Sequence, residues 1–262
     1  MRIARFSVDD EPKYGVVETD DPEGLAGTVA VLDSDPLYRP VKFTGEQLQL
    51  ADVRLLAPVI PRSKVVCVGR NYRAHAEELG NEVPAEPMIF LKPNTSVVGP
   101  RDGIVYPEQT NDLHFEGELA IVIGRICRDL PKERVDEVIF GYTIANDVTA
   151  RDLQKTDGQW ARAKGYDTFC PLGPWISTDL DVSDVRISTT LNGEPKQDGR
   201  TSQFIFDIPE VLAYITSFTT LLPGDVVLTG TPAGVGPMLP GDEVAISVDG
   251  LGTLTNKVIV RD

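Results

Sequence analysis

Cysteine is scarce in this sequence. Among the 262 residues there are three cysteines, Cys67, Cys127 and Cys170, which lie far apart and form no CxxC pair. This spacing indicates neither a disulfide framework nor a zinc site built from thiolates. Their apolar neighbours favour places in the core over a role as nucleophiles. We therefore expect a reducing, cytoplasmic setting.

Long hydrophobic runs are also lacking. Apolar runs such as residues 119–123 and 226–228 have at most the length of a strand, and the first fifteen residues carry charges where a signal peptide would need an apolar stretch. We expect that no part of the chain inserts into or crosses a membrane. Hydrophobic residues still make up 41% of the sequence, which is enough for one large domain, or for a main domain with a small appendage.

Basic residues are in the minority. The sequence has 25 lysines and arginines against 40 acidic residues, which gives a formal net charge of −15. A charge of this sign repels nucleic acid and anionic lipid surfaces. We therefore expect neither a nucleic acid nor a membrane as a partner.

Short strand-like segments dominate the chain, and helical patterns are few. Asn192-Gly193 and Asp249-Gly250 predict hairpin turns. Strands are expected at residues 3–8, 14–18, 28–32, 64–69, 88–92, 116–124, 139–146, 175–178, 185–191, 225–229, 243–248 and 253–260. Because too few helices alternate with these strands for a doubly wound fold, the pattern predicts a mostly β fold with a few short helices.

The chain divides near a proline-bounded stretch at residues 57–61. Residues 1–60 predict a small β-rich N-terminal domain, in which acidic and Gly/Pro turns separate short strands. Residues 63–262 predict a larger second domain that begins with a buried strand. Helices are expected in it at residues 72–79, 132–138 and 208–217.

Two glutamates lie on one face of a predicted strand. The strand period of two places Glu116 and Glu118 side by side. Such close carboxylates raise each other's pKa unless a cation lies between them, and hard cations such as Mg²⁺, Mn²⁺ or Ca²⁺ suit oxygen ligands. Asp147, at the end of another strand, is a third candidate ligand, and no EF-hand loop or HExxH motif competes. A solvated strand end that carries two acids is the alternative interpretation.

A histidine and a glutamate share the helix predicted at residues 72–79. His75 and Glu78 are three residues apart, so the carboxylate can orient or charge the imidazole. Such a pair could activate water. An ordinary exposed pair on a helix surface is the alternative.

Basic residues concentrate just after Asp147. Arg151, Lys155, Arg162 and Lys164 lie within fourteen residues of one another. Such a cluster could receive an anionic substrate. A solvated, charged loop is the alternative interpretation.

A glycine-rich segment, TGTPAGVG at residues 229–236, follows a predicted strand. Its backbone N–H groups and hydroxyls could bind a carboxylate or a phosphate. It matches neither GxGxxG nor the P-loop motif, and no helical pattern follows it. Nucleotide binding is therefore not expected.

Taken together, six motifs resemble the fumarylacetoacetate hydrolase family. In chain order they are GRNYRAH (69–75), FLKPNTS (90–96), HFEGEL (114–119), NDVTARDLQ (146–154), Lys164 followed by CPLGP (170–174), and LTGTPAGVG (228–236). The resemblance covers about residues 63–262. It implies a mixed β-sandwich roll of the kind found in that family, usually paired into a homodimer.

The resemblance also implies roles for individual residues. The metal, Mg²⁺ or Mn²⁺ and in some members Ca²⁺, would be held by Glu116, Glu118 and Asp147. Catalytic positions are matched by His75, Glu78 and Lys164, and positions that line the substrate pocket are matched by Arg151, Gln154 and Thr231.

The implied reaction is cleavage of a C–C bond in a small β-diketo acid, an acylpyruvate such as fumarylpyruvate. The metal would act as a Lewis acid, and water activated by His75 would attack the distal carbonyl. Cleavage would leave the enolate of pyruvate. The same enolate could arise by decarboxylation of oxaloacetate. A proton shift on a bound dienol would instead make the enzyme a 2-hydroxyhepta-2,4-diene-1,7-dioate isomerase. A non-catalytic cation-binding module is the alternative from another class.

Overall fold

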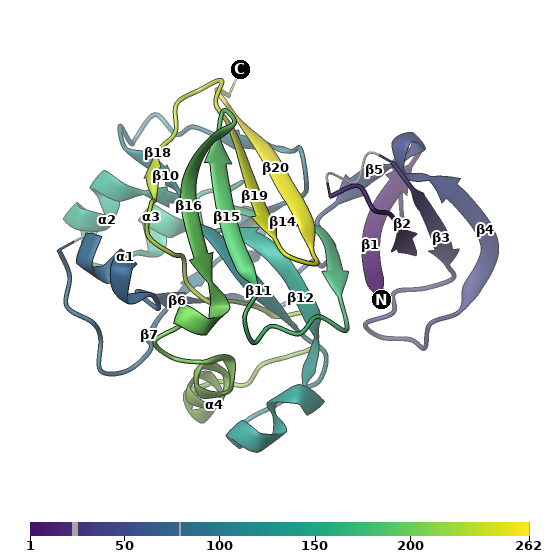
Figure 1. The fold of residues 1–262 in the computed structure, drawn as a ribbon, viewed down its shortest axis with the longest axis horizontal. Coiled ribbons are helices and arrows are strands. Elements are labelled where there is room, and N and C mark those ends of the chain that lie inside the picture. The colour runs from purple at the N-terminus through teal and green to yellow at the C-terminus, as the bar shows by residue number, and fades with distance from the viewer. Residues whose placement is uncertain (23–25, 79, 262) are drawn as a thin grey trace.

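The protein is mostly β, with a small unit at the N-terminus beside a larger sandwich (Figure 1). The structure is a computed structural model, and it describes residues 1–22, 26–78 and 80–261. The large sheet follows the strand order β4-β3-β2-β1-β14-β12-β11-β17-β6-β7, with β5 paired to β1 and β8 to β14. A second sheet has the order β16-β15-β19-β20-β9, and a small third one has the order β13-β10-β18.

The N-terminal unit supplies one end of the large sheet. Its elements are β1 (Arg2–Val8), β2 (Glu11–Glu18), β3 (Thr28–Leu32), β4 (Phe43–Gln49), η1 (Leu50–Asp52) and β5 (Arg54–Leu56). Their apolar side chains, Phe6 and Val29 among them, pack around Trp175, which belongs to β14 (Cys170–Ser177) in the larger unit. β1 also pairs with β14, with Ile3 opposite Ile176. The small unit is therefore joined to the larger one by backbone pairing between strands and by a shared apolar cluster.

The rest of the large sheet and the five-stranded sheet form the two layers of the sandwich. To the large sheet belong β6 (Val65–Gly69), β7 (Met88–Lys92), β8 (Val97–Val98), β11 (Gly117–Ile123), β12 (Ile139–Asn146) and β17 (Val226–Leu228). The five-stranded sheet comprises β9 (Gly103–Val105), β15 (Arg186–Leu191), β16 (Glu194–Arg200), β19 (Glu243–Val248) and β20 (Gly252–Ile259). The small sheet comprises β10 (Leu113–Phe115), β13 (Thr149–Ala150) and β18 (Gly236–Pro237). In Figure 1 the five-stranded sheet lies in front of β11, β12 and β14.

Strand β11 is buried on both faces, because an apolar cluster lies on each side of it. Leu119 and Ile121 point into the larger apolar cluster, whereas Ala120 and Val122 point into a second cluster on the opposite face. This alternation is the strand period that the sequence predicts. Gly117 faces β15, where an added Cβ would lie 2.4 Å from the Thr189 hydroxyl oxygen. Close packing of the two layers therefore requires glycine between the two glutamates.

Helices cover the edges of the sandwich. They are α1 (Arg73–Glu78), α2 (Arg151–Asp157), α3 (Ala161–Gly165) and α4 (Ile208–Phe218), with short 3-10 turns at η2 (Asn94–Ser96), η3 (Lys132–Glu137) and η4 (Thr201–Gln203). α4 begins at a capping box, because the Asp207 side chain accepts from the Glu210 N–H at 2.8 Å. In the described ranges no helix combines the length and hydrophobicity needed to span a bilayer.

The predicted mostly β fold is confirmed, while several boundaries differ. The segment predicted as a helix at residues 132–138 is a 3-10 turn, and residue 79, the predicted end of the first helix, lies outside the described residues. β4 and the helices α2 and α3 were not expected from the sequence pattern. α2 and α3 matter for function, because they carry the basic residues that follow Asp147.

Candidate active site

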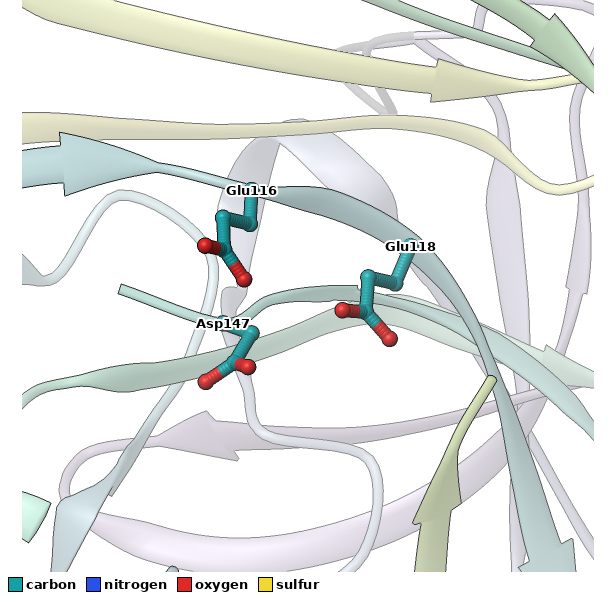
Figure 2. Close-up of side chains that lie close together, drawn as sticks. All are labelled: Glu116, Glu118 and Asp147. Atoms are coloured by element: carbon teal, nitrogen blue, oxygen red, sulfur yellow. The ribbon is translucent and has the colours of Figure 1, made fainter. Parts of the chain in front are cut away.

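Three carboxylates meet at the point where the chain crosses from the small sheet to the large one. Glu116 lies between β10 and β11, Glu118 lies on β11, and Asp147 follows the end of β12. The Asp147 N–H donates to the Glu116 carbonyl at 2.9 Å, and the Asn146 side chain accepts from the Glu116 N–H at 3.0 Å. These bonds hold the segment before β11 opposite the end of β12. Carboxylate oxygens from all three side chains lie within 4.8 Å of one another and point to a common centre (Figure 2).

Two of the three carboxylates are held by buried cations. Lys164 Nζ donates to Glu116 Oε2 at 2.7 Å and to Asp147 Oδ2 at 2.5 Å, while Arg151 Nη2 donates to Glu116 Oε1 at 2.5 Å. Burial opposes the charged form of Glu116, but Lys164 and Arg151 outweigh it and lower the pKa of this carboxyl group. The same contacts with Asp147 and Glu116 outweigh burial and raise the pKa of Lys164.

Glu118 differs from the other two carboxylates. It is 2% exposed, and its Oε2 accepts a hydrogen bond from the Gly230 N–H at 2.6 Å. Burial, followed by repulsion from Asp147 and Glu116, raises the pKa of Glu118 well above its ordinary value. A divalent cation among the three side chains would relieve this repulsion, and an all-oxygen set suits Mg²⁺, Mn²⁺ or Ca²⁺. The residues therefore fit the metal that the sequence predicts.

In the predicted His75–Glu78 pair, His75 lines the same cavity. His75 is 4% exposed, so the alternative of an ordinary exposed helix pair does not apply to it. Its Nδ1 lies 3.5 Å from Glu78 Oε2, and Glu78 in turn accepts from the Gly234 N–H at 3.0 Å. Burial lowers the pKa of His75 below 6.5, although Glu116 and Glu78 oppose this shift. The imidazole is therefore neutral at pH 7 and can accept a proton.

The residues predicted to line the substrate pocket also reach this cavity, which measures about 220 Å³. Among its walls are His75, Glu116, Glu118, Asp147, Arg151, Gln154, Lys164 and Thr231. Arg151 Nη1 donates to Gln154 Oε1 at 2.7 Å, which leaves the amide N–H₂ of Gln154 as a donor. Thr231 donates to the Gly117 carbonyl at 2.9 Å and accepts from Gln197 Nε2 at 2.7 Å, so its hydroxyl proton is already engaged.

The glycine-rich segment after β17 contributes backbone rather than a phosphate site. Gly230 has a φ of 98°, and an added Cβ would lie 2.7 Å from the Asn71 Cβ. Glycine is needed there so that its N–H can reach Glu118. The N–H of Gly234 likewise contacts Glu78. Both bonds go to acidic side chains of the site, so this segment positions them.

Lys92 is a site residue that the sequence analysis did not single out. It ends β7, is 1% exposed, and donates from Nζ to Asp147 Oδ1 at 2.5 Å and to the Val148 carbonyl at 3.1 Å. Its signal in the sequence is a lysine at the end of an otherwise apolar strand, inside the motif FLKPNTS. Because Lys92 approaches Asp147 from behind the cavity wall, we regard it as a positioning residue for that carboxylate.

Other predicted features lie away from the chemistry. Arg162 pairs with Asp157 at 2.5 Å near the surface, so only part of the basic cluster faces the cavity. Cys67, Cys127 and Cys170 are all buried and free, as expected of core residues. Burial raises the pKa of Cys170 to about 12, so this thiol stays protonated and unreactive.

Comparison with known proteins accounts for nearly the whole chain. Residues 64–259 match the family described as fumarylacetoacetate (FAA) hydrolase C-terminal, and residues 1–58 match Rv2993c-like, N-terminal. A solved structure of 2-hydroxyhepta-2,4-diene-1,7-dioate isomerase from Mycobacterium marinum is 50% identical, with a TM-score of 0.92 over 100% of this chain and 99% of that one.

Two further relatives differ in the activity that their names give. Mitochondrial oxaloacetate decarboxylase of Dictyostelium discoideum is 45% identical over 197 residues, which are 72% of this chain and 90% of that protein. Maleylpyruvate hydrolase from Sphingobium sp. SYK-6, solved with manganese(II) and pyruvate, is 31% identical with a TM-score of 0.81 and covers 100% of both chains. The matched domain, the fold and these relatives together establish that the chain belongs to the fumarylacetoacetate hydrolase family.

Proposed function

We propose that the protein is a divalent-metal-dependent hydrolase that cleaves the C–C bond of an acylpyruvate. The observation that carries this proposal is one cavity in which three converging carboxylates face a buried, neutral histidine. A metal site alone would need the carboxylates, whereas hydrolysis also needs a base. The relative named maleylpyruvate hydrolase, solved with manganese(II) and pyruvate, supports the same assignment.

The carboxylates of Glu116, Glu118 and Asp147 would hold Mg²⁺ or Mn²⁺, with Ca²⁺ as a further candidate. When bound, the cation would act as a Lewis acid toward the 2-oxo acid end of the substrate. Lys164 is buried beside this position, and its ammonium group would stabilise negative charge that develops on the substrate. The amide of Gln154 would donate a hydrogen bond to a substrate oxygen.

His75 would act as the general base. Its neutral imidazole would take a proton from water, and the resulting hydroxide would attack the distal carbonyl of the β-diketo acid. The C–C bond would then break, leaving a carboxylic acid and the enolate of pyruvate, and the proton held by His75 would return to the enolate carbon. Glu78 would orient the imidazole and stabilise its charged form, because the two side chains lie 3.5 Å apart.

The same groups would also support two neighbouring reactions. Decarboxylation of oxaloacetate gives the same pyruvate enolate, and the relative from Dictyostelium discoideum is named for it. A 1,3-proton shift on a bound dienol would make the protein an isomerase, which is the activity named for the relative from Mycobacterium marinum. In that reaction His75 would transfer a proton from the enol oxygen to carbon without activating water.

A non-catalytic cation-binding module is disfavoured by the surroundings of the carboxylates. A cation that merely joined strands would need neither a buried histidine at the cavity wall nor a cavity that opens beside it.

Removal of the metal tests the proposed function directly. Protein stripped with a chelator should show no turnover of fumarylpyruvate, maleylpyruvate or oxaloacetate, and added Mn²⁺ should restore turnover of at least one of them. Release of pyruvate can be followed by a coupled assay. Absence of turnover of both fumarylpyruvate and maleylpyruvate in the presence of Mn²⁺ would argue against the hydrolase assignment, and turnover of oxaloacetate alone would indicate a decarboxylase.

We also propose that the chain forms a homodimer. β7 ends the large sheet, so one of its edges has no partner strand among the residues that the structure describes. Leu91 on β7 is 53% exposed and Phe218 on α4 is 54% exposed, and both line one hollow together with Ile89 and Tyr214. Two copies of this apolar patch could cover each other about a twofold axis.

Sedimentation analysis tests this arrangement. The wild-type protein should have twice the chain mass of 28.6 kDa, and Leu91→Asp should shift it towards the monomer because a charge would enter the contact. Ile126→Asp, at a side chain that is 67% exposed elsewhere, is the matched control and should remain dimeric. A monomeric wild-type protein would contradict the proposal.

A further inference from the structure

Two cationic side chains line the cavity without an acidic partner. Arg70 follows β6, and Lys155 lies on α2. Within residues 1–22, 26–78 and 80–261, neither side chain makes an ion pair or a side-chain hydrogen bond. Both side chains face the cavity instead, although the chain carries a formal net charge of −15. Unpaired cations at a cavity mouth are suited to an anionic ligand.

The charged side chains at the carboxylate cluster balance one another. Three acids, Glu116, Glu118 and Asp147, are matched by three buried bases, Lys92, Lys164 and Arg151. The formal charges of these six groups cancel, and a divalent cation adds two positive charges. The enolate of pyruvate carries two negative charges, one on its carboxylate and one on its oxygen, so it would neutralise them. Arg70 and Lys155 are therefore in excess of what the pyruvyl end of a substrate needs.

α2 sets the depth at which Lys155 lies. Residues three and four apart share one face of a helix, so Arg151, Gln154 and Lys155 all face the cavity. Arg151 is buried, Gln154 is partly buried and Lys155 is exposed. The helix thus runs from the carboxylate cluster outwards, and Lys155 lies at the outer end.

Arg70 is held in place by its backbone. Its φ of 56° is in the left-handed region, which side-chain-bearing residues seldom adopt. The next residue, Asn71, is fully buried and fixes the turn, because its amide donates to the carbonyls of Phe206 and Thr229 at 3.0 and 2.8 Å. Strain of this kind persists where the surroundings impose it, commonly at ligand sites.

Aromatic rings form part of the cavity wall. Phe90 and Trp160 both line it and pack edge to face, with ring centroids 5.2 Å apart. A ring atom of Trp160 would lie 2.9 Å from a Cβ placed on Gly69, so this wall is closely packed beside Arg70. The space suits a short carbon chain that links two polar ends. At about 220 Å³ the cavity is also smaller than the roughly 300–1,000 Å³ of pockets for drug-sized ligands, which favours a small acid.

We propose that Arg70 and Lys155 bind a second carboxylate of the substrate, so that the enzyme selects oxo-dicarboxylates over acylpyruvates with a neutral end. The proposal rests on the proposed function, because it assumes that the pyruvyl end lies at the three acids. It assigns specificity to two residues outside the metal site and the His75–Glu78 pair. The second carboxylate would lie at the mouth of the cavity, beyond the aromatic wall.

Kinetics with two matched substrates test the selection. Succinylpyruvate carries the distal carboxylate, and succinamoylpyruvate replaces it by an amide of the same shape. Arg70→Asn keeps a residue that tolerates the left-handed backbone, and Lys155→Met keeps the length of the side chain. We expect each variant to lower kcat/KM for succinylpyruvate about tenfold, and the double variant about a hundredfold, because each removes a charge-assisted hydrogen bond. For succinamoylpyruvate, kcat/KM of these variants should change less than about threefold. Lys257→Met, at an exposed side chain on β20, is the control, and its kcat/KM should change less than about threefold for both substrates.

A binding experiment separates this proposal from the proposed function. 2-Oxoadipate and 2-oxohexanoate differ only in the distal group and have no 4-oxo group to cleave, so calorimetry in the presence of Mn²⁺ reports binding alone. The wild type should prefer 2-oxoadipate, and the double variant should lose the preference. If acylpyruvates are not cleaved but the preference is found and lost as described, the hydrolase assignment fails and the selection stands. Equal binding of both acids by the wild type, or a preference that survives in the double variant, would overturn the selection.

Discussion

Replacing Glu118 by glutamine is expected to weaken Mn²⁺ binding at least about 100-fold, and to leave the metal-free protein as stable as the wild type or more stable. Glu118 is buried beside Glu116 and Asp147, and burial together with their repulsion raises its pKa. A neutral amide removes that repulsion, and its oxygen can still accept from the Gly230 N–H. The gain in the free energy of unfolding without metal should reach up to about 2 kcal/mol.

Calorimetric titration of Mn²⁺ and thermal unfolding measure the two effects. Mn²⁺ at 100 times its Kd should stabilise the wild type by about 2.7 kcal/mol, and Glu118→Gln should show almost none of this shift. Glu108→Gln, at an exposed glutamate, is the matched control and should behave as the wild type. If Glu118→Gln kept the wild-type affinity for Mn²⁺, the three carboxylates would not be the metal site.

Replacing His75 by asparagine is expected to lower kcat for hydrolysis by about 10²–10⁴-fold while Mn²⁺ affinity changes less than about threefold. The reason is that His75 has the role of proton acceptor and not of ligand, since the metal-binding set consists of carboxylates. Glu78→Gln should cause a smaller loss, because Glu78 acts through the imidazole. Steady-state kinetics and calorimetry of the same preparations give both quantities.

The sequence offers a close control for this experiment. It contains two histidines, and the second, His114, pairs with Asp112 through Nε2 at 2.8 Å and is not among the residues that line the cavity. His114→Asn should lower kcat less than about fivefold. Equal losses of turnover and of Mn²⁺ affinity in His75→Asn would show that the histidine supports the metal site and would contradict its role as base.

The sequence predicted those parts of the fold that depend on local patterns. β11 was predictable because apolar residues continue through 119–123 and are buried on both faces. α4 was predictable from its cap and its apolar face. β4 was not, because most of its side chains are exposed and show no alternation. α2, with the sequence RDLQKTD, has almost no apolar face, so its formation depends on tertiary contacts such as that of buried Arg151 with Glu116.

The candidate site divides in the same way. Glu116 and Glu118 were placed together by strand periodicity, and His75 and Glu78 by helix periodicity, since both relations are local. Lys92 was missed because its partner Asp147 is 55 residues away, and no local pattern shows which strands become neighbours. The family motifs contain both residues, but only the strand order β11-β17-β6-β7 brings β7 to the back of the site.

The pairing of β1 with β14 has a consequence for the order in which the chain is completed during synthesis. Residues 1–58 leave the ribosome before the larger unit, yet Trp175, which packs within their core, follows more than a hundred residues later. β1 must therefore wait for β14, which is synthesised later, and contacts of such long sequence separation slow folding. The small unit is for the same reason a poor candidate for transfer to another protein on its own. A transplanted copy would lack both the neighbouring strand and the indole around which it packs.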